Sequence, residues 1–137
     1  MRFVIDTNIF VSAMMNEDSD VSRAVYVAIK RGHLLFSSIT FLELLNVIER
    51  VSVKKYIKLE LKNIILHLLE HSKKIKKVEV TEVITDCPDP KDNKFLELAV
   101  CGKADVIISS DVKHLIPMSP YRGIPILRPK EFLEKYG

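Results

Sequence analysis

Acidic residues directly follow two short apolar segments of this sequence, and carboxylates in such places are able to bind metal ions. Asp6 ends the apolar run at residues 2–5, and Asp111 follows the run at 106–108 after two serines. Short apolar runs of this kind are typical of buried parallel strands. Because parallel strands end on the same edge of a sheet, and α/β proteins bind their ligands beyond that edge, we expect Asp6 and Asp111 to lie close together.

Three further carboxylates can reach the same edge. Asp89 and Asp92 open the helix expected before residues 106–108, and Glu43 lies one turn into a helix that follows another expected strand. Converging carboxylates repel one another unless a cation neutralises them. Their oxygen atoms favour a hard divalent cation, Mg²⁺ or Mn²⁺. Two such ions can activate a water molecule and stabilise the leaving oxygen of a phosphodiester.

Spacing alone leaves a plainer interpretation of each acid open. Asp6 and Asp111 could simply cap the helices that follow them. Asp92, at the third position of its helix, could only complement the helix dipole. Glu43 shares a stripe with other polar residues, so it could belong to a solvated helix face.

The elements that must position these acids alternate between strand and helix. Apolar runs predict strands at 2–5, 34–36, 106–108 and 125–127, with a further strand at 77–80. Helical spacing predicts helices at 7–15, 20–31, 38–48, 53–72 (one or two helices), 90–101 and 129–136. Asp89 is expected to cap the helix that begins with Pro90. The alternation predicts an α/β fold, with a parallel sheet covered by helices on both faces and right-handed crossovers.

Length and composition indicate one soluble globular domain spanning residues 1–137. Hydrophobic residues make up 47% and charged residues 28% of the chain, which excludes disorder and fibrous structure. No apolar run is long enough to cross a bilayer, and the early Asp6 leaves no room for the apolar region of a signal peptide. Cys87 and Cys101 are too few for a disulfide framework, so we expect a cytoplasmic protein.

Taken together, the acidic motifs resemble those of the PIN-domain ribonucleases, in the branch of toxin–antitoxin toxins. The matching segments keep the family's order along nearly the whole chain: VIDTN at 4–8, FLELL at 41–45, DPKDNKFLELA at 89–99, ADVIISSD at 104–111 and ILRPKEFL at 126–133. One departure is Ser109-Ser110, where family members more often carry a threonine. A serine hydroxyl can donate the same hydrogen bond.

The resemblance implies a three-layer α/β/α sandwich around a mostly parallel sheet, and Mg²⁺- or Mn²⁺-dependent cleavage of single-stranded RNA. It further implies a homodimer and a toxin whose partner is a small antitoxin protein. The matching positions assign catalysis and metal binding to an acidic quartet, Asp6, Glu43, Asp92 and Asp111. Residues implied to orient or assist this quartet are Asn8, Ser109 and Asp89.

A lysine-rich stretch lies between the second and third acidic motifs. From Lys54 to Lys77 there are eight lysines against two glutamates. This stretch is either a solvated face or a surface that follows the phosphates of RNA, and the candidate RNA-binding residues are Lys73, Lys74, Lys76 and Lys77. Residues 53–75 also contain enough leucine and isoleucine to form a dimer interface.

Three other functions remain as alternatives. The sequence His67-Leu68-Leu69-Glu70-His71 matches the inverted zinc-peptidase motif, but its histidines lie on a polar stripe, which favours a solvated helix face. A non-catalytic PIN domain that binds RNA or a partner is the second alternative, and the complete quartet argues against it. A phospho-acceptor receiver domain is the third, but Thr7-Asn8 stands where an acidic pair would be needed.

Overall fold

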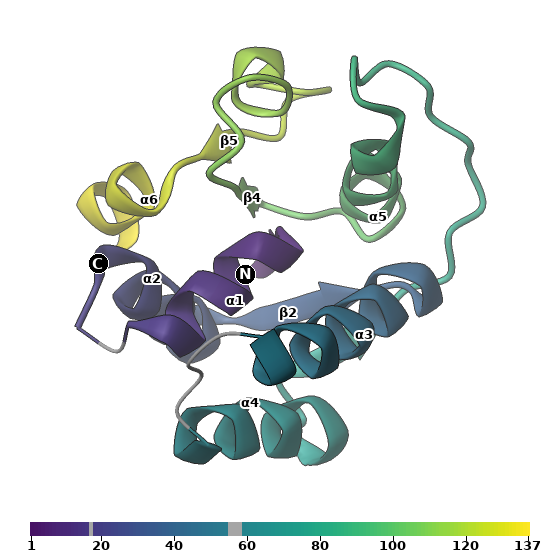
Figure 1. The fold of residues 1–137 in the computed structure, drawn as a ribbon. Helices are drawn as coiled ribbons and strands as arrows, with labels where there is room; N and C mark the ends of the chain where they lie inside the picture. The colour runs from purple at the N-terminus through teal and green to yellow at the C-terminus, as the bar shows by residue number, and fades with distance from the viewer. Residues whose placement is uncertain (17, 55–58) are drawn as a thin grey trace.

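The computed structural model describes residues 1–16, 18–54 and 59–137 of the chain (Figure 1). Its sheet contains β1 (Arg2–Ile5), β2 (His33–Phe36), β3 (Ile75–Lys77), β4 (Val106–Ile108) and β5 (Ile126–Leu127). All neighbouring strands are parallel, in the order β3-β2-β1-β4-β5. The chain therefore has the predicted parallel sheet, and β1 lies at its centre.

Helices connect the strands within the described residues. The α-helices are α1 (Thr7–Met15), α2 (Asp20–Arg31), α3 (Ser38–Lys54), α4 (Leu59–His71), α5 (Asn93–Cys101) and α6 (Pro129–Tyr136), and short 3₁₀ turns are formed by Pro90–Asp92 and Ile116–Met118. None of these helices is long and apolar enough to cross a membrane.

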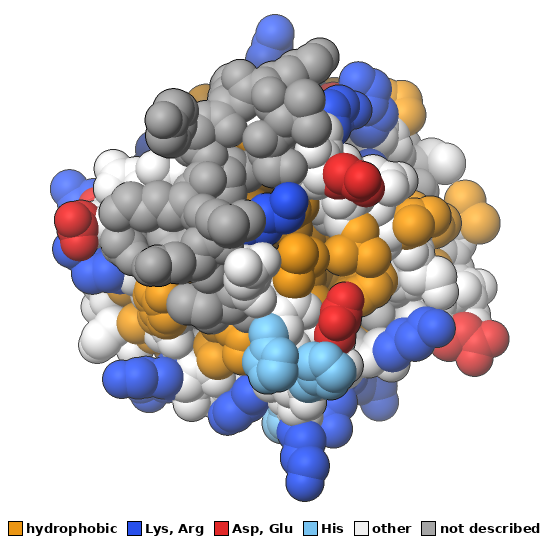
Figure 2. Space-filling view, turned by 60° about the horizontal axis from the view of Figure 1, so that its bottom comes forward, with side chains coloured by type: hydrophobic (Ala, Val, Ile, Leu, Met, Phe, Trp, Pro, Cys, Tyr) orange, Lys and Arg blue, Asp and Glu red, His pale blue; other side chains and the backbone are white. Residues whose placement is uncertain are grey.

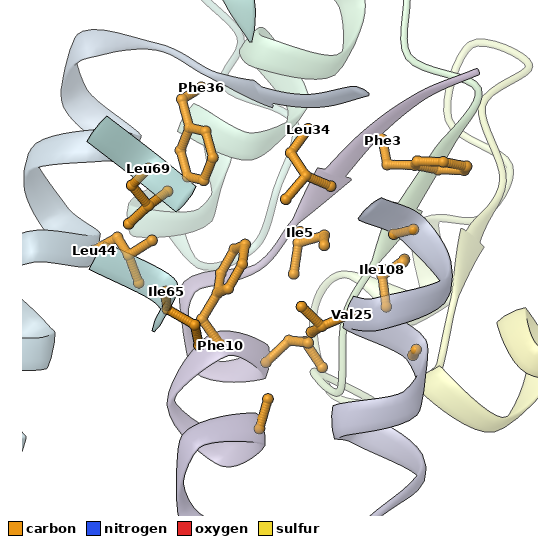
Figure 3. Packing of buried hydrophobic residues seen from close by; sticks show 14 of the residues in the cluster. Phe3, Ile5, Phe10, Val25, Leu34, Phe36, Leu44, Ile65, Leu69 and Ile108 are labelled. Atoms are coloured by element: carbon orange, nitrogen blue, oxygen red, sulfur yellow. The ribbon is translucent and has the colours of Figure 1, made fainter. Parts of the chain in front are cut away.

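Alternating side chains of the strands fill two separate cores. On one face, Phe3 and Ile5 of β1 pack with apolar residues of α1, α2, α3, α4 and α6 (Figure 3). On the other face, Val4 packs with apolar residues of α5 and of the loops at 84–87 and 115–121. Because helices cover both faces of the sheet, the fold is the predicted three-layer α/β/α sandwich.

Most element boundaries agree with the sequence, and the third strand is the main exception. We expected it at 77–80, but it lies at Ile75–Lys77. Its partner β2 ends at Phe36, which pairs with Lys77, and Ser37 already leads into α3. The N–H of Val78 still donates to the Phe36 carbonyl at 2.8 Å. The residues after Val78 have no further residue of β2 to pair with.

Two helical predictions need adjustment. The helix expected from Pro90 begins with a 3₁₀ turn, and regular α-helix starts only at Asn93. The stretch expected to hold one or two helices at 53–72 contains the end of α3 and the whole of α4. Residues 55–58 lie outside the described residues, so the predicted dimer interface at 53–75 is only partly covered by the structure.

Candidate functional site

The site is built at the carboxyl ends of β1 and β4. These strands pair in parallel, and Ile5 lies opposite Ile108. Asp6 follows Ile5 directly, and its backbone N–H extends the sheet by donating to the carbonyl of Ile108 at 3.0 Å. The side chain of Asp6 is 5% exposed. Sheet pairing therefore fixes this carboxylate at the sheet edge, in a largely dry environment.

Ser109 connects Asp6 with Asp111. The Ser109 hydroxyl is fully buried and donates to Oδ2 of Asp6 at 2.9 Å. Oγ of Ser109 in turn accepts the backbone N–H of Asp111 at 3.0 Å. Ser109 therefore contacts Asp6 directly, in agreement with the orienting role that the resemblance implies. Its hydroxyl donates the hydrogen bond that we expected from the threonine more common in the family.

Both aspartates also cap the chain that follows them. Oδ1 of Asp6 accepts the backbone N–H of Asn8 at 3.2 Å. Oδ1 of Asp111 accepts the N–H groups of Lys113 and His114 at 3.2 and 3.1 Å. The helix-capping interpretation is therefore confirmed for Asp6, the N-cap of α1, whereas Asp111 caps a turn and not a helix. Capping does not exclude metal binding, because each carboxylate oxygen has two lone pairs. Asn8 contacts Asp6 through its backbone, while its own side chain is exposed.

Asp92 faces Asp111 from the beginning of α5. Burial, a side-chain hydrogen bond with Asp111, and the negative charges of Asp6 and Asp89 raise the pKa of Asp92 to about 6. Burial also raises the pKa of Asp6, with further increases from the charges of Asp111 and Glu43, despite the hydrogen bond from Ser109. Burial opposes ionisation of Asp111 too, but the backbone N–H of His114 and the hydrogen bond with Asp92 lower its pKa overall.

The predicted carboxylates act on one another electrostatically: Asp92 shares a hydrogen bond with Asp111 and faces the charge of Asp6, and Glu43 adds its charge from α3. Among the described residues, however, the closest group of potential metal ligands is Asp89, Asp92 and His114. Repulsion of this kind is relieved by a divalent cation with oxygen ligands. The donor set therefore fits Mg²⁺ or Mn²⁺.

Glu43 has a partner that the sequence did not reveal. Its Oε2 forms an ion pair with Nζ of Lys94 on α5, and the side chains are 29% and 21% exposed. The pair joins α3 to α5 beside the acidic edge. Lys94 lies only two residues after Asp92, and its place in the third acidic motif indicated that it could lie near the site. Its contact with Glu43 depends on tertiary packing.

His114 is the second residue that sequence analysis missed. A ring nitrogen of His114 and one oxygen each of Asp89 and Asp92 all lie within 4.8 Å of one another. His114 Nδ1 also lies 3.5 Å from Oδ1 of Asp111. Asp89 caps the 3₁₀ turn as predicted, accepting the N–H of Lys91 at 3.2 Å. In the sequence, only the spacing of three residues between Asp111 and His114 indicated that the histidine could lie near this acid.

The four candidate RNA-binding lysines do not gather on one edge. Lys77 ends β3 and so lies at the same sheet edge as the acids. Lys73 and Lys74 precede β3, and the carbonyl of Lys74 accepts the N–H of Leu34 near the start of β2. They therefore lie at the opposite edge. At the start of β2, burial lowers the pKa of His33, and the positive charges of Lys76 and Lys74 lower it further.

The zinc-peptidase alternative finds no support on α4. His67, Glu70 and His71 are all exposed, and among the described residues only the cluster of Asp89, Asp92 and His114 groups its ligand atoms closely enough to hold a metal ion. Figure 2 shows the α4 side of the molecule, where histidine side chains lie on the surface beside a patch of hydrophobic side chains. This is the solvated face that the polar stripe predicted.

Comparison with known proteins agrees with this fold. A family profile described as PIN domain matches residues 2–113, so the chain belongs to the PIN-domain family. Among solved structures, it is similar to a chain in the crystal structure of VapBC2 from Rickettsia felis bound to a DNA fragment from their promoter. The TM-score is 0.58 at 14% identity, over 93% of this chain and 98% of that chain. No curated protein matches the sequence.

Proposed function

We propose that the chain is a Mg²⁺- or Mn²⁺-dependent endoribonuclease that cleaves single-stranded RNA. The observation that carries the proposal is the set of hydrogen bonds that links three acids: the buried hydroxyl of Ser109 contacts Asp6 and the backbone of Asp111, and Asp92 shares a side-chain hydrogen bond with Asp111. The family match supports a nuclease at this site.

The residues of the site have distinct roles in this proposal. Asp6, Asp92 and Asp111 would hold the cation, and Glu43 would complete the acidic quartet. A divalent cation bound there supplies activation of water and stabilisation of the leaving oxygen of a phosphodiester. Ser109 fixes the orientation of Asp6 and the backbone of Asp111 before any ligand arrives. Carboxylates that are held in this way lose less freedom when they bind an ion.

The proposal is tested with a fluorescent single-stranded oligoribonucleotide. Purified protein should cleave it with Mg²⁺ or Mn²⁺ and lose activity in excess EDTA. Asp6→Asn and Asp111→Asn should be inactive, whereas Asp18→Asn, in the exposed turn between α1 and α2, should keep full activity. Cleavage that continues in EDTA, or that survives Asp111→Asn, rules the mechanism out.

We further propose that the nuclease is the toxin of a toxin–antitoxin pair and binds a small antitoxin protein in the cytoplasm. The similar fold in VapBC2 supports this proposal. So does an apolar groove between α3 and α4, lined by residues that include Phe41, Leu42 and Leu69, in which Leu42 is 58% exposed. An exposed apolar groove of this kind is suited to an apolar segment of a partner.

The partner is tested by co-expression with the protein encoded beside this gene. Leu42→Glu should abolish co-purification, because it places a charge in the apolar groove. Val83→Glu, at a residue that is 84% exposed outside the groove, is the matched control and should leave co-purification unchanged. Retention of the partner by Leu42→Glu would show that it binds elsewhere.

A further inference from the structure

A groove of about 590 Å³ is connected with the acidic site through Lys94, which lines the groove and pairs with Glu43. Its walls come from three parts of the chain: the start of α3, the segment that follows β3, and the first turns of α5. The lining residues include Ser37, Ser38, Lys77, Val78, Lys94 and Glu97. The groove is therefore at the same carboxyl edge of the sheet as Asp6 and Asp92.

Lys94 belongs to the groove and to the acidic site at once. Its ammonium group pairs with Glu43, while its side chain lines the groove. An ammonium group has three N–H donors, so the pairing with Glu43 leaves donors for a second anion. The same pairing holds the long side chain of Lys94 in place, which reduces the entropy lost when that anion binds.

Lys77 approaches the groove from β3. It is the last residue of that strand and its side chain is exposed. Ser38, at the start of α3, adds an exposed hydroxyl nearby. Two acids also line the groove, Glu79 and Glu97. Oε2 of Glu97 accepts the backbone N–H of Ile84 at 2.9 Å, and Glu79 is exposed.

We propose that Lys77 and Lys94 form a phosphate-binding subsite for the RNA strand next to the bond that is cleaved, and that Glu43 orients Lys94 in it. This inference rests on the proposed nuclease function and adds to it. The groove begins at the acidic edge, and each of its two lysines carries a charge that a phosphodiester backbone would recognise. Lys73 and Lys74, at the opposite edge, have no part in the subsite.

The experiment measures binding of a fluorescent single-stranded oligoribonucleotide in EDTA, where cleavage is prevented, as a function of salt concentration. Each lost phosphate contact should flatten the slope of log affinity against log salt by about 0.7. The gain in affinity between 1 M and 0.1 M salt should then be about fivefold smaller in the variant than in the wild type. Lys77→Gln and Lys94→Gln should each show this change, and the double variant about twice the change in slope. Lys94→Arg, which keeps the charge, should retain the wild-type slope.

Two controls separate binding from a structural effect. Lys30→Gln, at an exposed residue near the end of α2, should leave the slope unchanged. The Mn²⁺ affinity of Lys77→Gln, measured by calorimetry without RNA, should equal that of the wild type. Wild-type slopes in both Lys77→Gln and Lys94→Gln, in a protein that cleaves RNA, overturn the subsite and leave the nuclease proposal standing. A wild type that neither binds nor cleaves RNA overturns both.

Discussion

The hydroxyl of Ser109 donates to Oδ2 of Asp6 at 2.9 Å across the boundary between β1 and β4. The two residues are 103 positions apart in sequence, and parallel pairing of their strands brings them together. Through its second contact, to the N–H of Asp111 at 3.0 Å, Ser109 sets the spacing of two acids. The geometry of the site thus depends on one small, fully buried polar side chain.

Removal of this hydroxyl should damage both stability and the site. Ser109→Ala leaves the N–H of Asp111 without its acceptor and Asp6 without its donor, so we expect the unfolding free energy to fall by about 1–3 kcal/mol. The Mn²⁺ affinity and RNA cleavage should fall with it. Ser109→Thr keeps the hydroxyl and should retain more activity than Ser109→Ala.

The control for this prediction is the adjacent serine. Ser110 is exposed, and Ser110→Ala should change the unfolding free energy by less than about 0.5 kcal/mol. Urea denaturation and calorimetric Mn²⁺ titration of the three variants provide the measurement. Equal behaviour of Ser109→Ala and Ser110→Ala would show that the bridging hydroxyl is dispensable.

Asp92→Asn should make the metal-free protein more stable. The substitution removes a negative charge that faces Asp6, Asp89 and Asp111, and it costs no cap, because the Asp92 side chain makes no capping hydrogen bond to α5. We expect a gain of about 1 kcal/mol without metal. A hundredfold excess of Mn²⁺ over its dissociation constant should stabilise the wild type by about 2.7 kcal/mol, and Asp92→Asn much less.

Thermal melts with and without Mn²⁺ check this prediction, with Asp18→Asn as the control of equal charge. Equal metal-induced shifts in the wild type and Asp92→Asn would remove Asp92 from the ligand set. Equal stability of the two proteins without metal would show that the carboxylates do not repel one another appreciably.

The stability of the metal-free protein should depend on pH through Asp92. Burial and neighbouring carboxyls raise its pKa from an ordinary 3.8 to about 6, so the folded protein holds this proton more tightly than the unfolded chain. The resulting stabilisation is fully present below about pH 4 and is lost as the pH rises through about 6. The raised pKa of Asp6 acts in the same direction.

The measurement is the unfolding free energy of the wild type minus that of Asp92→Asn, in EDTA, between pH 4 and 8. This difference should fall as the pH rises and then level off. In saturating Mn²⁺ the trend should reverse, because the metal binds only the ionised carboxylates. A difference independent of pH in EDTA would mean that Asp92 ionises as an ordinary exposed aspartate.

The positions of Asp6 and Asp111 could be predicted because local sequence determines them. Each follows a short apolar run that is typical of a buried strand, and parallel strands end on one edge. The alternation of strand and helix likewise predicted the three layers. The bounds of β3 could not be obtained in this way, because they depend on where its partner β2 ends, and that is a property of the pairing.

The contacts of Lys94 and His114 could not be predicted from local sequence. Lys94 meets Glu43 because α3 and α5 pack against each other, although 51 positions separate the two residues. Nothing in the helical pattern of α5 distinguishes Lys94 from a solvated lysine. His114 similarly reaches Asp89 and Asp92 through the chain path after β4. The arrangement of the candidate RNA-binding lysines could not be predicted either, because β3 separates Lys77 from Lys73 and Lys74 and places them at opposite edges of the sheet.

His114→Ala should change which metal ion the protein prefers. Its ring nitrogen lies close to oxygens of Asp89 and Asp92, and an imidazole nitrogen is a better ligand for a transition-metal ion such as Co²⁺ than for Mg²⁺. If His114 contributes a ligand, His114→Ala should lower the Co²⁺ affinity by roughly tenfold or more and the Mg²⁺ affinity only slightly. Calorimetric titration of the metal-free proteins measures both, and His67→Ala on α4 is the histidine control. An equal loss for both ions would mean that His114 acts only by orienting Asp111, which lies 3.5 Å from its Nδ1, and no loss for either would remove it from the site.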